Sequence, residues 1–412
     1  MKFKNYIIFL KDVLIYTLTA FGGPQGHIGM MHKKFVLQKN YLSEEELFEY
    51  FSFCQLLPGA SSTQTIGLIG YKKGGILLSI LTLIIWIIPA CFLMGLLSFI
   101  ISSNSEYQIN KSIFQFIQPM AIGFLIYTIY TMYLSSINNT ITKTIAIVAT
   151  TLTFLFFKTP WIFPLLIITA SLITNISKKR IPNYQTKEKL KIRWMYLFLF
   201  LFIFVFAGLL SETARKQNYE NRKMYNLFEN FYRFGSIVFG GGDVLLPMMV
   251  DQYIERPLKK EDEKNIIKIN KEDLITGYGI VRIIPGPVFS FGSYVGGLAL
   301  KSDGKKNQIL GSILGSIALF LPSTLILFFF FPVYEKIKNF SYIFRALEGI
   351  KAVVVGLLSA TLLYLIKDVF TFNIQTVAIN FTLICTTFLL LRYTKTHSPI
   401  IVLFCLLLGW IF

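Results

Sequence analysis

The segment VRIIPGPVFSFG (Val281 to Gly292) places one arginine beside residues that interrupt a helix, inside a long apolar stretch. Pro285 removes a backbone donor and Gly286 adds backbone freedom, so a new helix N-terminus begins there, with free N–H groups and a positive dipole end. The planar guanidinium of Arg282 can hold an oxyanion through two parallel hydrogen bonds. These groups, with the hydroxyl of Ser290, predict a binding site for a small anion.

A second copy of this pattern lies earlier in the chain, in QLLPGASSTQTIG (Gln55 to Gly67). Pro58 and Gly59 again interrupt the apolar run, and Ser61 and Ser62 follow with two hydroxyls. A single proline kink in a membrane helix is most simply structural, whereas two aligned proline-glycine pairs favour a function. Two broken helices that enter from opposite sides would bring two positive helix ends to one anion.

Glycine clusters precede both copies, in FGGPQGHIGMM (Phe21 to Met31) and FGGGDVLLPMM (Phe239 to Met249). Glycines at these positions permit either close helix packing or a further break that lines the path of the anion. The four glycines that we include in the predicted site are Gly22, Gly23, Gly240 and Gly241.

Four titratable residues near these motifs are candidates for coupling transport to a second ion. Asp243 is expected either to take up a proton or to pair with Arg282, and Glu348 is the other acid within reach of that arginine. Lys351 lies three residues after Glu348, a spacing that predicts an ion pair on one helix face. His27 is a candidate proton or anion partner, with a structural histidine as the alternative.

Composition indicates a membrane protein whose spans position these residues. Of 412 residues, 54% are hydrophobic and 16% aromatic, which is more apolar surface than a soluble domain of this size can bury. The formal net charge of +18 lies mainly in the loops, so positive-inside topology explains it better than nucleic-acid binding. The sequence shows no P-loop, no metal-ligand spacing and no catalytic set, so we expect neither an enzyme nor a bound metal or cofactor.

The apolar runs predict an all-α bundle with a cytoplasmic N-terminus and an external C-terminus. The thirteen predicted spans are residues 6–22, 46–70, 75–101, 113–136, 141–157, 160–177, 193–211, 228–250, 273–300, 308–332, 343–366, 374–391 and 398–412.

The repeated motifs divide the chain into two repeats of about six spans, residues 1–178 and 226–412. Residues 179–225 form a basic linker with one unpaired span, 193–211. Seven spans separate the repeat starts, and an odd number predicts that the second repeat is inverted in the membrane.

The quoted motifs and the order of the spans resemble the long, two-domain form of the chromate ion transporter family. The resemblance implies a multi-pass plasma-membrane protein that exports chromate on an ion gradient, with sulfate as competitor. We expect a proton as the coupling ion. Sulfate uptake or exchange, and an anion channel on the same scaffold, remain alternatives, and a homodimer is possible. The first copy reads PGAS where the second reads PGPV, so the two halves are not expected to contribute equally.

Overall fold

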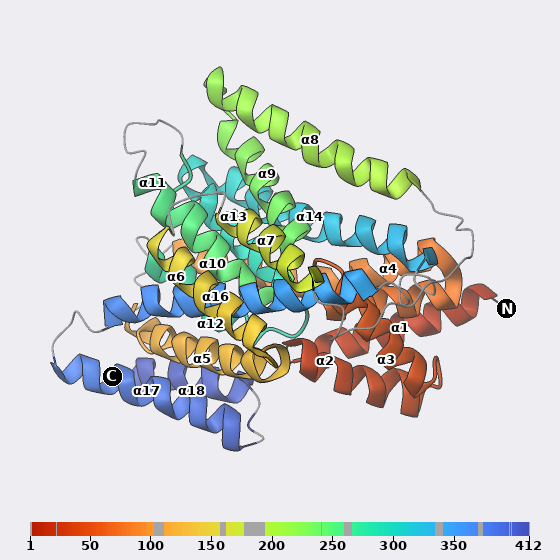
Figure 1. The fold of residues 1–412 in the computed structure, drawn as a ribbon, viewed down its shortest axis with the longest axis horizontal. Coiled ribbons are helices and arrows are strands. Elements are labelled where there is room, and N and C mark those ends of the chain that lie inside the picture. The colour runs from red at the N-terminus through yellow and green to blue at the C-terminus, as the bar shows by residue number, and fades with distance from the viewer. Residues whose placement is uncertain are drawn as a thin grey trace.

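Every described element of this chain is a helix, in a computed structural model that describes residues 2–21, 23–102, 111–156, 162–176, 194–239, 241–258, 266–333, 341–369, 374–394, 396 and 398–411 (Figure 1). The helices of the first half are α1 (Lys2–Thr19), α2 (Gly23–Met31), the π-helix η1 (His32–Gln38), α3 (Glu44–Leu56), α4 (Ser61–Ser102), η3 (Lys111–Phe114), α5 (Ile117–Ser136), α6 (Thr140–Leu155) and α7 (Ile162–Ile176). Helix α8 (Trp194–Lys216) follows.

The second half repeats this order with more interruptions. Its elements are α9 (Arg222–Ile237), η4 (Gly242–Val244), α10 (Leu245–Val250), the π-helix η5 (Asp251–Glu255), α11 (Arg256–Leu258), α12 (Lys271–Ile280), η6 (Val288–Ser290), α13 (Phe291–Ala299), η7 (Lys301–Asp303), α14 (Lys305–Phe330), η8 (Phe331–Val333), α16 (Ser341–Val369), α17 (Ile374–Tyr393) and α18 (Ser398–Ile411).

Five helices in the described residues are long and apolar enough to cross a membrane: α4, α5, α8, α14 and the Phe344–Ile366 part of α16. Shorter apolar helices accompany them. This composition confirms the predicted all-α membrane bundle.

The first half begins with two helical hairpins. In hairpin 1 (residues 2–38), α1 runs to residue 19 and α2 and η1 return along it, so that the Tyr16 hydroxyl donates to the His27 carbonyl over 3.1 Å. In hairpin 2 (residues 44–73), α3 and the first part of α4 run antiparallel. Glu46 and Lys72 form an ion pair between its two open ends.

The second half begins with two equivalent hairpins. In hairpin 3 (residues 222–258), α9 meets η5, and the rings of Phe234 and Tyr253 lie 6.4 Å apart. In hairpin 4 (residues 271–299), the Tyr294 hydroxyl of α13 donates to the Asp273 carbonyl at the start of α12 over 2.6 Å. The proline-glycine and glycine-cluster motifs lie at the four tips.

These hairpins correct part of the span prediction. Residues 46–70, 228–250 and 273–300 do not form single helices that cross the bilayer, because in each case the two ends meet at the same end of a hairpin. Hydropathy cannot distinguish the two arrangements, since two packed arms of half length contain the same number of apolar residues as one span.

Equivalent helices of the two halves run antiparallel. After a sharp turn at Gly74 and Gly75, the second part of α4 runs beside α14. Gln308 near the start of α14 donates to the Ser102 hydroxyl at the end of α4 over 2.9 Å, while the ring of Phe328 near the end of α14 lies 6.4 Å from that of Tyr71. Antiparallel equivalents are what an inverted duplication requires.

The halves also exchange their later helices. Helix α16 of the second half packs on α6 and α7, and α5 of the first half packs on α17 and α18 (Figure 1). A glycine permits each close approach: a Cβ at Gly356 would lie 2.7 Å from the Ala146 carbonyl of α6, and a Cβ at Gly123 would lie 2.9 Å from the Ile384 carbonyl of α17.

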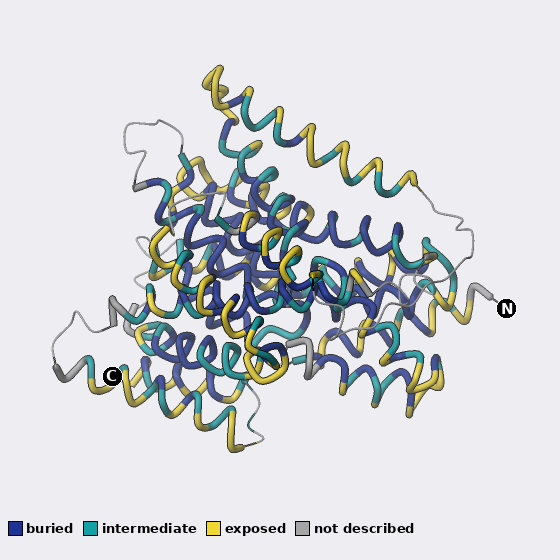
Figure 2. Tube along the Cα trace, in the orientation of Figure 1, coloured by how far each residue is buried: buried dark blue, intermediate teal, exposed yellow. Residues whose placement is uncertain are grey.

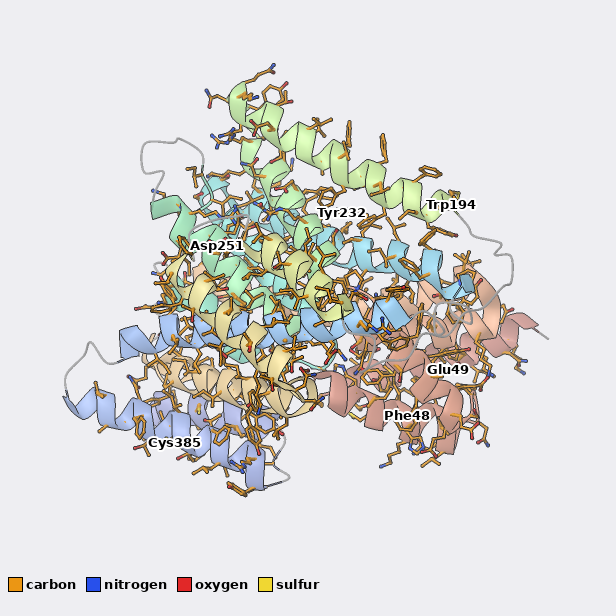
Figure 3. All side chains as sticks on the ribbon, viewed as in Figure 1. Phe48, Glu49, Trp194, Tyr232, Asp251 and Cys385 are labelled. Atoms are coloured by element: carbon orange, nitrogen blue, oxygen red, sulfur yellow. The ribbon has the colours of Figure 1, made fainter. Side chains whose placement is uncertain are left out.

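Helix α8 lies at the edge of the bundle and is exposed along most of its length (Figure 2). Of its residues only Ala207 and Ala214 are buried, which fits a helix surrounded by lipid. Tyr232 of α9, labelled in Figure 3, attaches it by donating from its hydroxyl to the Phe200 carbonyl over 3.1 Å. It lies in the chain between α7 of the first half and α9 of the second, and its role as an unpaired span stays a prediction.

The open end of hairpin 3 holds a buried carboxylate, Asp251 (Figure 3). Its Oδ2 lies 2.6 Å from Nη2 of Arg256. Burial nevertheless raises the pKa of Asp251 to about 6, because loss of hydration outweighs the attraction of Arg256.

Asp251 is expected to make stability depend on pH. Between its ordinary pKa of 3.8 and about 6 the folded chain binds more protons here than the unfolded chain, so the free energy of unfolding falls as pH rises through that window. Asp251→Asn should remove this component, on the order of 1–3 kcal/mol, from thermal unfolding followed in detergent. Glu220→Gln, at an exposed acid, is the control; an unchanged pH dependence in Asp251→Asn would contradict the assignment.

Candidate functional site

The four hairpin tips meet in the centre of the molecule. The Gly59 N–H of hairpin 2 donates to the Val238 carbonyl of hairpin 3 over 2.7 Å. The Gly286 N–H of hairpin 4 donates to the Ala20 carbonyl of hairpin 1 over 2.9 Å. The two bonds are equivalent, since Ala20 and Val238 each precede a Phe-Gly-Gly motif and each glycine follows a proline. Each half therefore binds the other through the same pair of motifs.

Two further contacts close these tips into a ring. His27 Nδ1 lies 3.1 Å from Ser62 Oγ, which joins hairpins 1 and 2. Gly242 packs so closely on the Val288 side chain that a Cβ would lie 2.7 Å from it, which joins hairpins 3 and 4. We call this arrangement the tip ring. The returning helix of every hairpin begins at the tip ring, so four helix N-termini, each with a positive dipole end, are gathered there.

Backbone geometry explains why glycine occupies two of the tips. Gly59 has φ +116° and Gly286 has φ +119°, a region that residues with a side chain rarely adopt. A Cβ at Gly286 would lie 2.8 Å from the Cβ of Ala90, and one at Gly59 would overlap the Cβ of Ser323. Ala90 and Ser323 each follow the helix proline of their half, so the two contacts are again equivalent.

Arg282 and Asp243 form an ion pair beside the tip ring. Tyr278 donates from its hydroxyl to Asp243 Oδ1 over 2.8 Å and accepts from Nη2 of Arg282 over 2.9 Å. Thr128 of α5 donates to the other carboxylate oxygen over 3.3 Å. The guanidinium carbon also lies 5.5 Å from the centre of the Phe124 ring.

This cluster resolves the open question of the partner of Arg282, which is Asp243 and not Glu348. The side chains of Arg282 and Asp243 are 12% and 16% exposed, so they are enclosed but not sealed from water or an ion. In this state the carboxylate of Asp243 accepts the hydrogen bond of the Arg282 guanidinium that an oxyanion would accept.

His27 is enclosed by aromatic and hydroxyl groups. Its ring stands edge-on to Trp86 with centroids 5.2 Å apart, and Trp86 Nε1 donates to Thr63 over 3.0 Å. The histidine is 1% exposed, and its Nε2 has no hydrogen-bond partner in the described residues. These contacts give His27 a structural role between hairpins 1 and 2. Its binding of a proton or of the anion stays a prediction.

The expected pair of Glu348 and Lys351 does not form. Glu348 instead accepts from the Asn139 side chain at the start of α6 over 2.5 Å. A spacing of three residues permits an ion pair but does not require one, because a partner from a neighbouring helix can turn the carboxylate away.

The other predicted residues lie at or near the tips. Ser61 and Ser62 begin the returning arm of hairpin 2, and Pro58 precedes its tip glycine. Ser290 is fully buried below the tip of hairpin 4, which Pro285 introduces.

Both glycine clusters coincide with chain reversals. Gly23 begins α2, and Gly241 has φ +115°, so the clusters mark breaks between arms. Gly22 and Gly240 lie outside the described residues.

Sequence reasoning missed the residues that surround the charged pair and His27. Tyr278 of α12 lies four residues before Arg282, which follows in the turn after this helix, and that spacing could have identified it. Thr128, Phe124 and Trp86 come from distant helices, and nothing in their local sequence marks them. Among the described residues no cluster of His, Cys, Asp and Glu could hold a metal ion.

The fold and the tip ring define a polytopic helical membrane protein whose two halves carry equivalent motifs at their hairpin tips. The chain belongs to the chromate transporter family, whose profile matches residues 8–176 and 225–410.

Two relatives illustrate how far the likeness extends. An uncharacterized transporter of Methanocaldococcus jannaschii is 24% identical over 400 residues, which cover 96% of this chain and 91% of that protein. The chromate transport protein of Cupriavidus metallidurans is 20% identical over 413 residues, which cover 97% and 92% respectively. No solved structure matches this chain significantly.

Proposed function

We propose that this protein is a secondary active transporter of a tetrahedral oxyanion that exports chromate, with sulfate as competitor. The observation that supports the proposal is the tip ring, where four helix N-termini lie together beside Arg282. Hydrogen bonds from the backbone N–H groups of Gly59 and Gly286 join the two halves there. Its relatives in the family include a chromate transport protein. The proposal includes insertion in the plasma membrane with the N-terminus in the cytoplasm.

Arg282 is the residue that binds the oxyanion in this proposal. The anion displaces Asp243 from the guanidinium, and a proton on Asp243 removes the competing negative charge. Arg282 belongs to the second half, and the tips of hairpins 1 and 2 belong to the first. Movement of one half against the other therefore opens the ring to one face of the membrane at a time.

Membrane potential favours the proposed direction. Moving one elementary charge through 100 mV is worth about 2.3 kcal/mol, so an inside-negative potential drives a dianion outward with about twice that free energy. Export therefore needs no ATP, whereas uptake would need a coupled cation. If a proton travels with the dianion on Asp243, one net negative charge still moves outward.

The test is flux of radiolabelled chromate and sulfate in proteoliposomes with an imposed potential and, separately, an imposed proton gradient. We expect chromate to move toward the positive side, sulfate to compete, and a proton gradient to change the rate. Accumulation of the anion against its own gradient in the proton-gradient arm, with the potential held at zero, would distinguish the carrier from the anion channel, because a channel accumulates an anion only in response to the potential. Absence of flux for both anions would contradict the proposal.

A further inference from the structure

Lys351 lies on α16 at the depth of the tip ring. At the open end of hairpin 3, Tyr364 of α16 forms a hydrogen bond to Glu255. Thirteen residues separate Lys351 from Tyr364, and thirteen separate Gly242 at the tip from Glu255. At about 1.5 Å per residue both distances are about 20 Å, and α16 also contacts η4 at the tip directly.

The side of α16 that carries Lys351 faces the protein and not lipid. Leu347, Val354 and Leu358 share this side by helical spacing, and all three are buried. Val354 and Leu358 belong to the same core as Val244 beside the tip of hairpin 3. The opposite side, at Val353 and Ala360, is also buried, because α16 packs there on α6 and α7.

Lys351 differs from Arg282 in its charge balance. Arg282 is matched by Asp243, whereas Lys351 makes no hydrogen bond and no ion pair with any described residue. A cation within a span is costly unless a counter-charge or water reaches it, so an unmatched one is expected to serve a function. The equivalent position of the first half is the neutral Gln118, so only the second half supplies this charge.

We propose that Lys351 is the second cation of the oxyanion site and makes the site prefer dianions over monoanions. This inference rests on the proposed function of the tip ring. A dianion released from water leaves one negative charge unmatched when Arg282 alone binds it, and the ammonium of Lys351 supplies the second positive charge. A monoanion does not need it.

The experiment compares Lys351→Met with wild type for transport of sulfate, chromate and nitrate in proteoliposomes. We expect the KM for the two dianions to rise roughly ten- to a hundredfold, as for loss of one charged hydrogen bond, with little change for nitrate. Lys351→Arg should keep the dianion preference. Gln118→Met, at the equivalent position of the other half, should leave all three KM values near those of wild type.

The outcomes separate this inference from the function on which it rests. An unchanged sulfate-to-nitrate ratio in a normally folded Lys351→Met variant would overturn the inference while oxyanion transport stands. Failure of wild type to transport any of the three anions would instead overturn the proposed function. If the methionine variant does not fold, Lys351→Gln, which copies Gln118, takes its place with the same readout.

Discussion

Arg282→Ala is expected to reduce chromate transport by about a hundredfold or more, because each charged hydrogen bond to the anion contributes about 1.5–3 kcal/mol and the guanidinium can form two. The substitution also leaves Asp243 enclosed without its cation, with Tyr278 and Thr128 as its donors among the described residues. Loss of one partner of a buried pair costs about 3–5 kcal/mol of stability, and the slight exposure of this pair puts the cost at the low end. Initial rates in proteoliposomes and thermal unfolding in detergent measure the two effects.

A second substitution separates binding from folding. Asp243→Asn in the Arg282→Ala background removes the unmatched charge, so stability should recover while transport stays absent. Asp243→Asn alone keeps the cation and removes its competitor, so transport should lose its dependence on the proton gradient. Normal chromate flux in Arg282→Ala would exclude the arginine from the site.

Gly59→Ala is expected to have the largest effect on folding, with a loss of roughly 2–6 kcal/mol from backbone strain and overpacking together. The added methyl group would overlap the Cβ of Ser323 at a φ of +116°. It would also disturb the hydrogen bond from the Gly59 N–H to the Val238 carbonyl. The amount of folded protein in the membrane and the midpoint of thermal unfolding report the loss.

Two comparisons divide this loss into its parts. Gly304 has φ +98° with no atom within 4 Å of an added Cβ, so Gly304→Ala measures backbone strain alone. Ser323→Gly added to Gly59→Ala removes the overlap and should recover part of the stability. Equal stabilities of Gly59→Ala and Gly304→Ala would show that the tip is not tightly packed.

Much of the architecture could be predicted without coordinates. Apolar composition gives the membrane class, because backbone groups in lipid must be satisfied within helices. The paired Pro-Gly and Phe-Gly-Gly motifs reveal the duplication and the helix breaks, since the backbone demands of proline and glycine are local. These signals also identified Arg282, Asp243 and both tip glycines.

Contacts between distant segments decided the rest. Whether the chain crosses the bilayer or turns back at Pro58 and Pro285 depends on what the second arm packs against, and hydropathy is the same in both cases. Helix packing likewise decides that Arg282 pairs with Asp243 and that Glu348 accepts from Asn139. It also leaves Lys351 without a partner in the part of the chain that the structure describes. Local sequence determined where the chain breaks and which charges it carries, and tertiary structure decided which of those charges meet, because pairing depends on distances that sequence spacing does not contain.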